Sequence, residues 1–242
     1  MGGAALVVDA ITVEFGSFRA IDGLSLAIDF GEVRAVIGPN GAGKTTLLDV
    51  VSGITRPAQG RVIFGDSTDL VRTSESGIAR GGVRRKFQKP SIFEGLNVRE
   101  HMVIGAQGGL KSRLKGQALD ARVDDMLETV GLSDLANRPA SELAHGQKQW
   151  LEIGMVLASD PSVLMLDEPV AGLTDEETER TIALVRALRR HDRAIIVVEH
   201  DMDFVERIAD RVTVLHEGKT LFEGSMANAR ADERVKNVYL GR

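Results

Sequence analysis

Cysteine is absent from the 242-residue chain, so the sequence excludes a disulfide-stabilised scaffold and any metal site built on thiolates. This absence is typical of a protein in a reducing compartment. Long apolar runs are absent as well, because no uncharged stretch reaches the roughly 20 residues that a membrane-spanning helix needs. Residues 1–9 lack the basic start and the cleavage pattern of a signal peptide. We therefore expect any link to a membrane to come through a partner.

The chain also lacks a strong charge of one sign. Its 30 basic and 35 acidic side chains give a formal net charge of −5, which provides no general attraction to nucleic acid. Hydrophobic residues make up 43% and charged residues 27% of the sequence, as in ordinary globular proteins. This length allows one large domain, or a core with a subdomain, around a substantial hydrophobic core.

What the sequence does contain is a complete phosphate-binding loop, Gly38-Pro-Asn-Gly-Ala-Gly-Lys-Thr-Thr46, between an expected strand at 33–37 and an expected helix at 45–52. Its glycines let successive N–H groups point at a polyphosphate, and the helix N-terminus adds partial positive charge. Lys44 can reach the β- and γ-phosphates of a nucleotide, and the Thr45 hydroxyl can bind Mg²⁺. The candidate nucleotide-binding residues of the loop are Gly38, Asn40, Gly41, Gly43, Lys44, Thr45 and Thr46.

A pair of carboxylates follows a second apolar strand. The run at 163–166 ends in Asp167 and Glu168, which places both at the carboxyl end of a strand, where α/β folds bind ligands. Asp167 is a candidate ligand of Mg²⁺, mostly through a bound water, and Glu168 is expected to face the water that attacks the γ-phosphate. The same pattern by itself also fits a strand that ends in a solvated turn. Its presence together with the phosphate loop favours the nucleotide site.

Strands and helices alternate in two styles along the chain. Residues 6–37 and 61–64 are rich in expected strands, and 83–87 is a further short strand. From about 97 to 160 the apolar spacing becomes helical. Alternation of strands and helices then resumes, with strands at 163–166, 194–198 and 211–215 and helices at 175–190 and 201–209. The pattern predicts a nucleotide-binding α/β core that is interrupted by a helical insertion.

Three further motifs give the chain a family resemblance. Leu143-Ala-His-Gly-Gln147 begins an expected helix, Gln88 follows the short strand at 83–87, and His200 follows the strand at 194–198. The phosphate loop and these motifs, with the Asp-Glu strand, resemble ATP-binding cassette (ABC) ATPases in order and approximate spacing over essentially all 242 residues. The resemblance implies a P-loop NTPase core of ABC type with an N-terminal antiparallel β subdomain. It further implies one domain, with core and β subdomain at about 1–96 and 161–242 and a helical subdomain at about 97–160.

The resemblance also implies roles for individual residues. Glu168 would be the general base, His200 would contact the γ-phosphate, and Gln88 would sense Mg²⁺ and the attacking water. Thr46 would add a contact to the α-phosphate. Phe15 would stack on adenine, although it is also a possible core residue and Phe18 is the other stacking candidate. In the family two cassettes pair head to tail, so the signature residues Ala144, Gly146 and Gln147 would contact the ATP of a second cassette.

Two positions depart from the family pattern. Ala144 stands where the signature usually has Ser, whose hydroxyl would bond the γ-phosphate across the dimer. One charge-assisted hydrogen bond of this kind contributes about 1.5–3 kcal/mol at most, so we expect weaker closure rather than inactivity. Thr174 stands where many members carry Asp, which leaves the cross-dimer contact there open.

The family branch that this chain resembles most takes up branched-chain amino acids and urea. The segments 143–155, 168–179 and 198–204 look most like the first ATP-binding subunit of urea transporters. The implied function is ATP hydrolysis that energises urea uptake, with a branched-chain amino acid importer as the alternative. A non-transport cassette acting on nucleic acid or ribosomes and a plain P-loop kinase fit the sequence less well.

The implied partners follow from this branch. They are transmembrane permease subunits, a second identical or paralogous cassette and, indirectly, an external substrate-binding protein, with no nucleic acid. The implied location is peripheral, on the cytoplasmic face of the inner membrane. The apolar cluster Pro90, Ile92, Phe93 and Leu96 is either buried hinge packing or a docking site for a short cytoplasmic helix of the permease.

Overall fold

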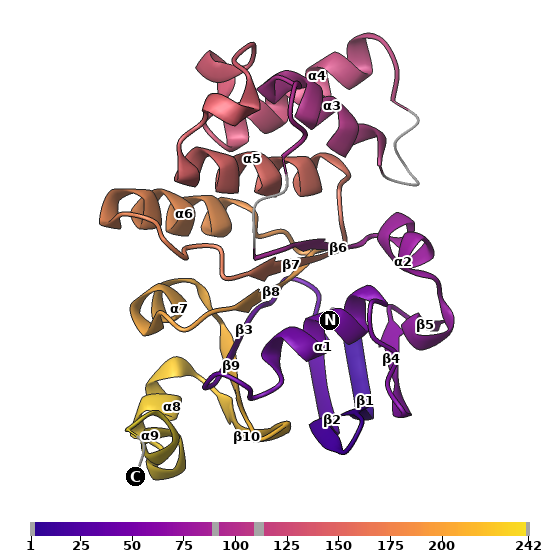
Figure 1. Cartoon of the computed structure of the whole chain (residues 1–242), viewed down its shortest axis with the longest axis vertical. Coiled ribbons are helices and arrows are strands. Elements are labelled where there is room, and N and C mark those ends of the chain that lie inside the picture. The colour runs from indigo at the N-terminus through magenta and orange to yellow at the C-terminus, as the bar shows by residue number, and fades with distance from the viewer. Residues whose placement is uncertain (1–2, 89–91, 109–113, 241–242) are drawn as a thin grey trace.

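The computed structural model describes residues 3–88, 92–108 and 114–240, and two sheets form its framework (Figure 1). The first is antiparallel, with the order β2-β1-β4-β5. Its strands are β1 (Ala4–Phe15), β2 (Phe18–Asp29), β4 (Gln59–Phe64) and β5 (Thr68–Asp69). The second has the order β10-β9-β3-β8-β7-β6. Its strands are β3 (Val33–Ile37), β6 (Val83–Lys86), β7 (Val163–Asp167), β8 (Ala194–Val198), β9 (Arg211–His216) and β10 (Lys219–Gly224).

Five strands of the second sheet are parallel, and β10 adds an antiparallel edge. Every residue of β3, β7 and β8 is buried, which explains why these strands are continuous apolar runs rather than alternating ones. Because the strands are parallel, their carboxyl ends meet at one edge of the sheet. This edge collects the phosphate loop after β3, the Asp-Glu pair at the end of β7 and the Glu-His pair after β8.

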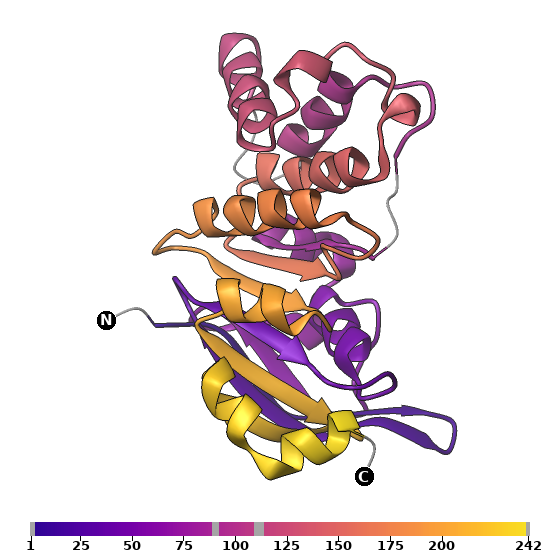
Figure 2. The ribbon, with the colours of Figure 1, turned by 90° about the vertical axis from the view of Figure 1, so that its left-hand side faces the viewer.

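Helices cover both faces of this sheet (Figures 1 and 2). Their bounds are α1 (Lys44–Ser52), α2 (Glu75–Gly81), α3 (Val98–Gln107), α4 (Gln117–Thr129), α5 (His145–Ala158), α6 (Asp175–Ala187), α7 (Met202–Ile208), α8 (Met226–Ala231) and α9 (Glu233–Leu240). One hydrophobic core cluster packs α1 and the antiparallel sheet against one face of the six-stranded sheet. A second cluster packs the helices α3, α4, α5 and α6 against the other face. A third lies under α7, α8 and α9. No helix in the described ranges combines the length and the apolar character that crossing a bilayer requires.

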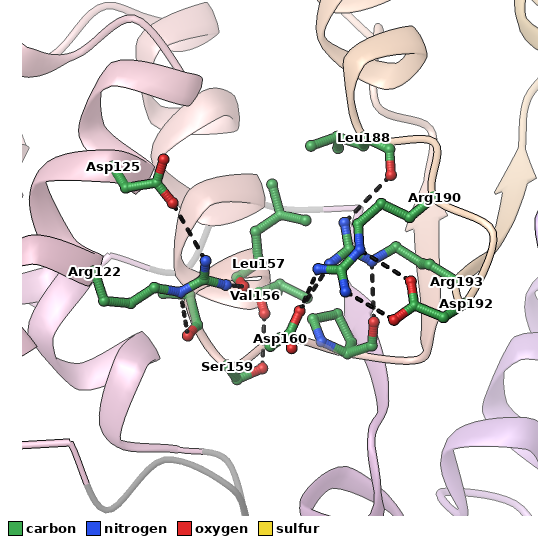
Figure 3. Close-up of polar contacts among 12 residues, drawn as sticks. Arg122, Asp125, Val156, Leu157, Ser159, Asp160, Leu188, Arg190, Asp192 and Arg193 are labelled. Carbon is green, nitrogen blue, oxygen red and sulfur yellow. Dashed lines mark hydrogen bonds and ion pairs between the residues drawn. The ribbon is translucent and has the colours of Figure 1, made fainter. Parts of the chain in front are cut away.

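The C-terminal end of α5 is held by arginines from two directions (Figure 3). Arg122 of α4 donates to the carbonyl oxygens of Leu157 and Ala158 at 2.7 and 3.3 Å, where a cation is favoured by the helix dipole. Arg193, just before β8, pairs with Asp160 at 3.1 Å and is 5% exposed. These contacts tie the end of α5 to both the helical region and the sheet.

The predicted fold class is confirmed, and the differences concern element ends and short helices. The helix expected at 175–190 ends at Ala187, because Arg190 forms a β-bridge with Arg193. The helix expected from Asp201 begins one residue later, since the Asp201 carboxylate caps it by accepting N–H bonds from residues 203 and 204. Helices α2, α8 and α9 were not predicted from the sequence, because they have only six to eight residues each and carry a weak periodic signal.

Candidate functional site

The phosphate loop has a backbone that only glycine fits at two positions. Gly43 has φ of 100°, and an added Cβ there would lie 2.8 Å from the carbonyl oxygen of Ala20. At Gly38 an added Cβ would lie 2.3 Å from the carbonyl oxygen of Leu215. Both distances are too short for a real side chain. The loop can therefore take this path only because both residues lack a Cβ.

Lys44 lies across the loop that precedes it. Its ammonium group donates to the carbonyl oxygens of Gly38 and Pro39 at 2.7 and 3.0 Å, and the residue is only 8% exposed. Burial lowers the pKa of Lys44, while the charges of Glu168 and Asp167 act in the opposite direction. Helix α1 begins at this residue without a side-chain cap, so its first N–H groups are free for an anion. A desolvated cation beside an uncapped helix N-terminus fits a polyphosphate.

The carboxylates at the end of β7 have different partners. Asp167 is 2% exposed, and its Oδ2 lies 2.6 Å from Nη2 of Arg85. Glu168 has φ of +46°, a costly conformation for a non-glycine residue, and its N–H donates to the carbonyl oxygen of Val198. Strain of this kind is often found at functional sites.

The structure brings the three predicted catalytic residues together. Nε2 of Gln88 donates to Oε2 of Glu168 at 2.5 Å, and Nδ1 of His200 lies 3.9 Å from Oε1 of the same carboxylate. The His200 side chain is 65% exposed and therefore open to a ligand. Glu168 is thus the common neighbour of a side chain after β6 and a side chain after β8.

Glu199 is a residue of this site to which the sequence analysis gave no role. It is fully buried, and its carboxylate accepts N–H bonds from Val170, His200 and Asp201 at 2.9–3.3 Å. Burial raises the pKa of Glu199, and these hydrogen bonds partly oppose that effect. Glu199 therefore fixes the chain after Glu168 and the backbone of His200. Its signal in the sequence is a carboxylate directly after a buried strand, as at Asp167.

The candidate metal ligands fit a Mg²⁺ ion that arrives with a nucleotide. Within the described ranges, no group of three or more His, Cys, Asp or Glu residues could hold a metal by itself. Mg²⁺ usually binds one or two carboxylates together with substrate phosphates and waters. Thr45, an exposed residue in the first turn of α1, and Asp167, at the end of β7, offer such a partial set of oxygen ligands.

The signature residues lie at the start of α5, where Gly146 is buried and Gln147 is partly exposed. Ala144 is the N-cap residue, and its N–H donates to Oε1 of Gln147 at 3.0 Å. The Gln147 side chain is therefore hydrogen-bonded to the N-cap backbone of its own helix. Gly146 packs against α6, because an added Cβ would lie 2.3 Å from Oε1 of Glu177. Ala144 and His145 are exposed, and His145 shares a hydrogen bond with the carbonyl oxygen of Ala171.

Two neighbouring residues have clear local roles. Thr174, the departure noted in the sequence, is the N-cap of α6 and forms a capping box with Glu177. Trp150 is 3% exposed and donates from Nε1 to Thr181 at 3.0 Å, which locks α5 to α6. Trp150 is therefore a packing residue.

The aromatic candidates for adenine lie at the tip of the first hairpin. Phe15 and Phe18 face each other across the turn and are 53% and 60% exposed. Phe15 is therefore not a core residue, and both rings are accessible to a ligand. The hairpin projects from the antiparallel sheet in Figure 2.

The fold and this edge of the sheet define the class as a P-loop ATPase of the ATP-binding cassette type. The chain matches the family described as ABC transporter over residues 21–171 and belongs to that family. It is 36% identical over 250 residues to the high-affinity branched-chain amino acid transport ATP-binding protein LivG of Escherichia coli K12, covering 98% of this chain and 97% of LivG. It is 34% identical to BraF of Pseudomonas aeruginosa, which has the same description, with the same coverage.

Solved structures agree with this assignment. A nucleotide-free ATP-binding cassette from an ABC transporter superposes with a TM-score of 0.87 at 28% identity, covering 99% of this chain and all of the other. An ATP-binding cassette of an ABC transporter in an ADP conformation gives 0.86 at 29% identity with the same coverage. The chain is an ABC transporter ATP-binding subunit, an ATPase coupled to transport.

Proposed function

We propose that this chain hydrolyses ATP to energise the import of branched-chain amino acids. The observation that carries the catalytic part is the convergence of Lys44, Glu168 and His200 at one edge of the sheet, around an uncapped helix N-terminus. In-line attack on a γ-phosphate requires positioning and charge neutralisation more than covalent chemistry, and these residues supply both.

Each residue of the site has a proposed role. Lys44 and the N–H groups of the loop bind the phosphates, and Thr46 adds a contact to the α-phosphate. Glu168 accepts the proton of the attacking water, while Gln88 and His200 orient that water and the γ-phosphate. Thr45 and Asp167 would hold Mg²⁺, which would supply neutralising charge to the phosphates when bound. Phe15 stacks on the adenine ring.

A second cassette completes the site in this proposal. Ala144 and His145 at the start of α5 are exposed, and Ala144 has no side-chain oxygen to cap the first N–H groups of the helix, so these groups are available to a phosphate outside their own subunit. We propose that Ala144 and Gly146 present this helix N-terminus to the ATP of the partner cassette. Gln147 contributes indirectly, because its side chain holds the Ala144 backbone.

The cargo that we propose differs from the urea expected in the sequence analysis. The relatives LivG and BraF carry the words branched-chain amino acid transport in their descriptions, and each aligns with 98% of this chain. These relatives support the alternative better than urea. The cassette itself is not expected to touch the cargo, so relatives are the proper basis for this choice.

The permease is proposed to dock beside Gln88. The apolar cluster expected there divides in two: Ile92 packs partly buried against the core, whereas Phe93 is 51% exposed. The Phe93 backbone is nevertheless fixed, because its N–H donates to Nε2 of the buried His101 at 2.9 Å. Pro90 lies outside the described residues. An exposed phenyl ring on a fixed backbone is a suitable contact for a short apolar helix of the permease on the cytoplasmic side of the membrane.

Uptake by the assembled transporter tests the proposal. The chain is produced with its permease and substrate-binding partners, and uptake of labelled leucine and labelled urea is measured in parallel. We expect the wild-type complex to take up leucine and the Lys44→Ala variant to show no uptake. Uptake of urea without leucine would overturn the cargo, and copurification with ribosomes instead of a permease would overturn the transport function.

Phe93→Ala tests the docking site in the same assay. Leucine uptake should fall severalfold while the ATPase activity of the isolated subunit stays unchanged. Ile54→Ala, at another exposed apolar residue, is the matched control and should leave uptake intact. Normal uptake with Phe93→Ala would place the docking site elsewhere.

A further inference from the structure

Arg85 is a buried arginine that joins Asp167 of the candidate nucleotide site to a second carboxylate, Asp49. It lies on β6, and its side chain is only 4% exposed. Nη1 lies 2.5 Å from Oδ1 of Asp49, and Nη2 lies 2.6 Å from Oδ2 of Asp167. The guanidinium group also lies over the ring of Phe87, 4.7 Å from its centroid. The planar guanidinium group of Arg85 therefore has three side-chain contacts.

The two carboxylates come from two different elements. Asp49 lies on α1, the helix that begins with Lys44, and Asp167 ends β7. Arginine is suited to such a bridge because its planar fork can serve two acceptors at once, which the single ammonium of lysine cannot do in the same geometry. A buried carboxylate without a partner is costly. Arg85 therefore neutralises the buried carboxylate of Asp167 and also pairs with the partly exposed Asp49.

Asp167 also has a proposed role in binding Mg²⁺. The proposed function places Mg²⁺ at this carboxylate, and the present inference rests on that placement. Among the described residues no cluster could hold a metal by itself, and Arg85 adds positive charge where a divalent cation would approach. A lone cation is therefore disfavoured, whereas a cation that carries the phosphates of ATP brings its own ligands and negative charge.

We propose that Arg85 provides a permanent positive charge beside Asp167, the carboxylate that would bind the metal. Arg85 thereby holds Asp167 in place, and it makes the site bind Mg²⁺ together with ATP but not Mg²⁺ by itself. Arg85 is a positioning residue in this role, because it acts through Asp167 and not on the substrate. It stands three residues before Gln88, so the same contact also fixes the end of the strand that leads to Gln88.

Thermal unfolding without nucleotide tests the inference with the metal alone as the probe. In Arg85→Met, Asp49 and Asp167 lose their shared cation, so the melting temperature in EDTA should fall. Magnesium chloride should then raise it by roughly 2–4 °C. The wild type should show no such rise at the same ionic strength. Arg61→Met, which breaks an exposed ion pair with Asp9, is the matched control and should behave as the wild type.

A conservative variant keeps the test informative if Arg85→Met does not fold. Arg85→Lys keeps the charge but not the bridge, so its response to magnesium chloride should be intermediate. ATP affinity in EDTA should stay within about threefold of the wild type for both variants, because the contacts of Lys44 are unchanged. The absence of a magnesium response in both variants would overturn the inference.

Asp167→Asn separates this inference from the proposed function. Added to Arg85→Met, it should abolish the magnesium response. Alone, it should strongly reduce turnover with Mg²⁺ and ATP. If Asp167→Asn keeps full turnover, the proposed metal site is wrong. If it loses turnover but the Arg85 variants ignore magnesium, only the role of Arg85 is wrong.

Discussion

The phosphate-loop half of the site and the signature half are built in opposite ways. In the first half, the charged side chains are paired inside the chain: Lys44 with its own loop, Asp167 with Arg85 and Glu168 with Gln88. In the second half, the start of α5 is exposed, and its cap residue, Ala144, has no polar side chain.

This difference assigns the two halves different tasks. The phosphate-loop half is formed within one chain, so it should bind ATP without help. The signature half has an exposed helix N-terminus whose use depends on a ligand held by another chain. Changes in the first half should therefore affect binding and chemistry, and changes in the second should affect pairing.

The largest effect is expected in the phosphate-loop half. Glu168→Gln should reduce steady-state ATP turnover by roughly 10²–10⁴, the range for loss of a positioned general base, and keep ATP binding. Malachite-green phosphate release and calorimetric titration with ATP measure the two quantities. Glu128→Gln, at an exposed position on α4, should change neither. Near-normal turnover in Glu168→Gln would remove this residue from its role.

A smaller effect is expected in the signature half from Gly146→Ala. The added methyl group would displace Glu177, which caps α6 through Thr174. Turnover should fall by about tenfold, whereas ATP affinity at low protein concentration should not change. The lost cap should also reduce the free energy of unfolding by about 1 kcal/mol.

The control for this variant is Gly81→Ala, because nothing lies within 4 Å of a Cβ at that helical position. Calorimetric titration and steady-state kinetics of both variants give the comparison. A fall in the ATP affinity of the Gly146→Ala monomer would show that the signature belongs to the same half as the phosphate loop.

The smallest effect is expected from Ala144→Ser. The new hydroxyl can donate to the γ-phosphate across the dimer, which contributes about 1.5–3 kcal/mol at most. It should tighten the ATP-driven dimer of the Glu168→Gln variant, as measured by sedimentation equilibrium. An unchanged dimer constant would mean that His145 or a backbone group already fills this place.

The local structure around the candidate site residues was predictable from the sequence. The glycine-rich loop, the carboxylates after an apolar run and the helix start at the signature are short patterns, and the structure has the expected strand or helix at each. Their convergence was predictable because parallel strands end at one edge. The exact end of α6 was not, since it depends on the bridge between Arg190 and Arg193.

Long-range partners could not be predicted. Arg85 was visible as a residue before Gln88, but its ion pair with Asp167, 82 positions away, depends on the pairing of β6 with β7. The hydrogen bond from the Ala144 N–H to the Gln147 side chain depends on the rotamer of Gln147. The cargo has no physical signature in this chain, because the cassette is not expected to contact it.

The most direct test of the two-half account is the size of the Glu168→Gln variant in sedimentation velocity runs with Mg²⁺ and ATP. We expect a dimer with ATP and a monomer with ADP or with no nucleotide. We also expect Gly146→Ala in the same background to shift the ATP sample toward monomer. A Glu168→Gln variant that binds ATP but stays monomeric at high protein concentration would contradict the account.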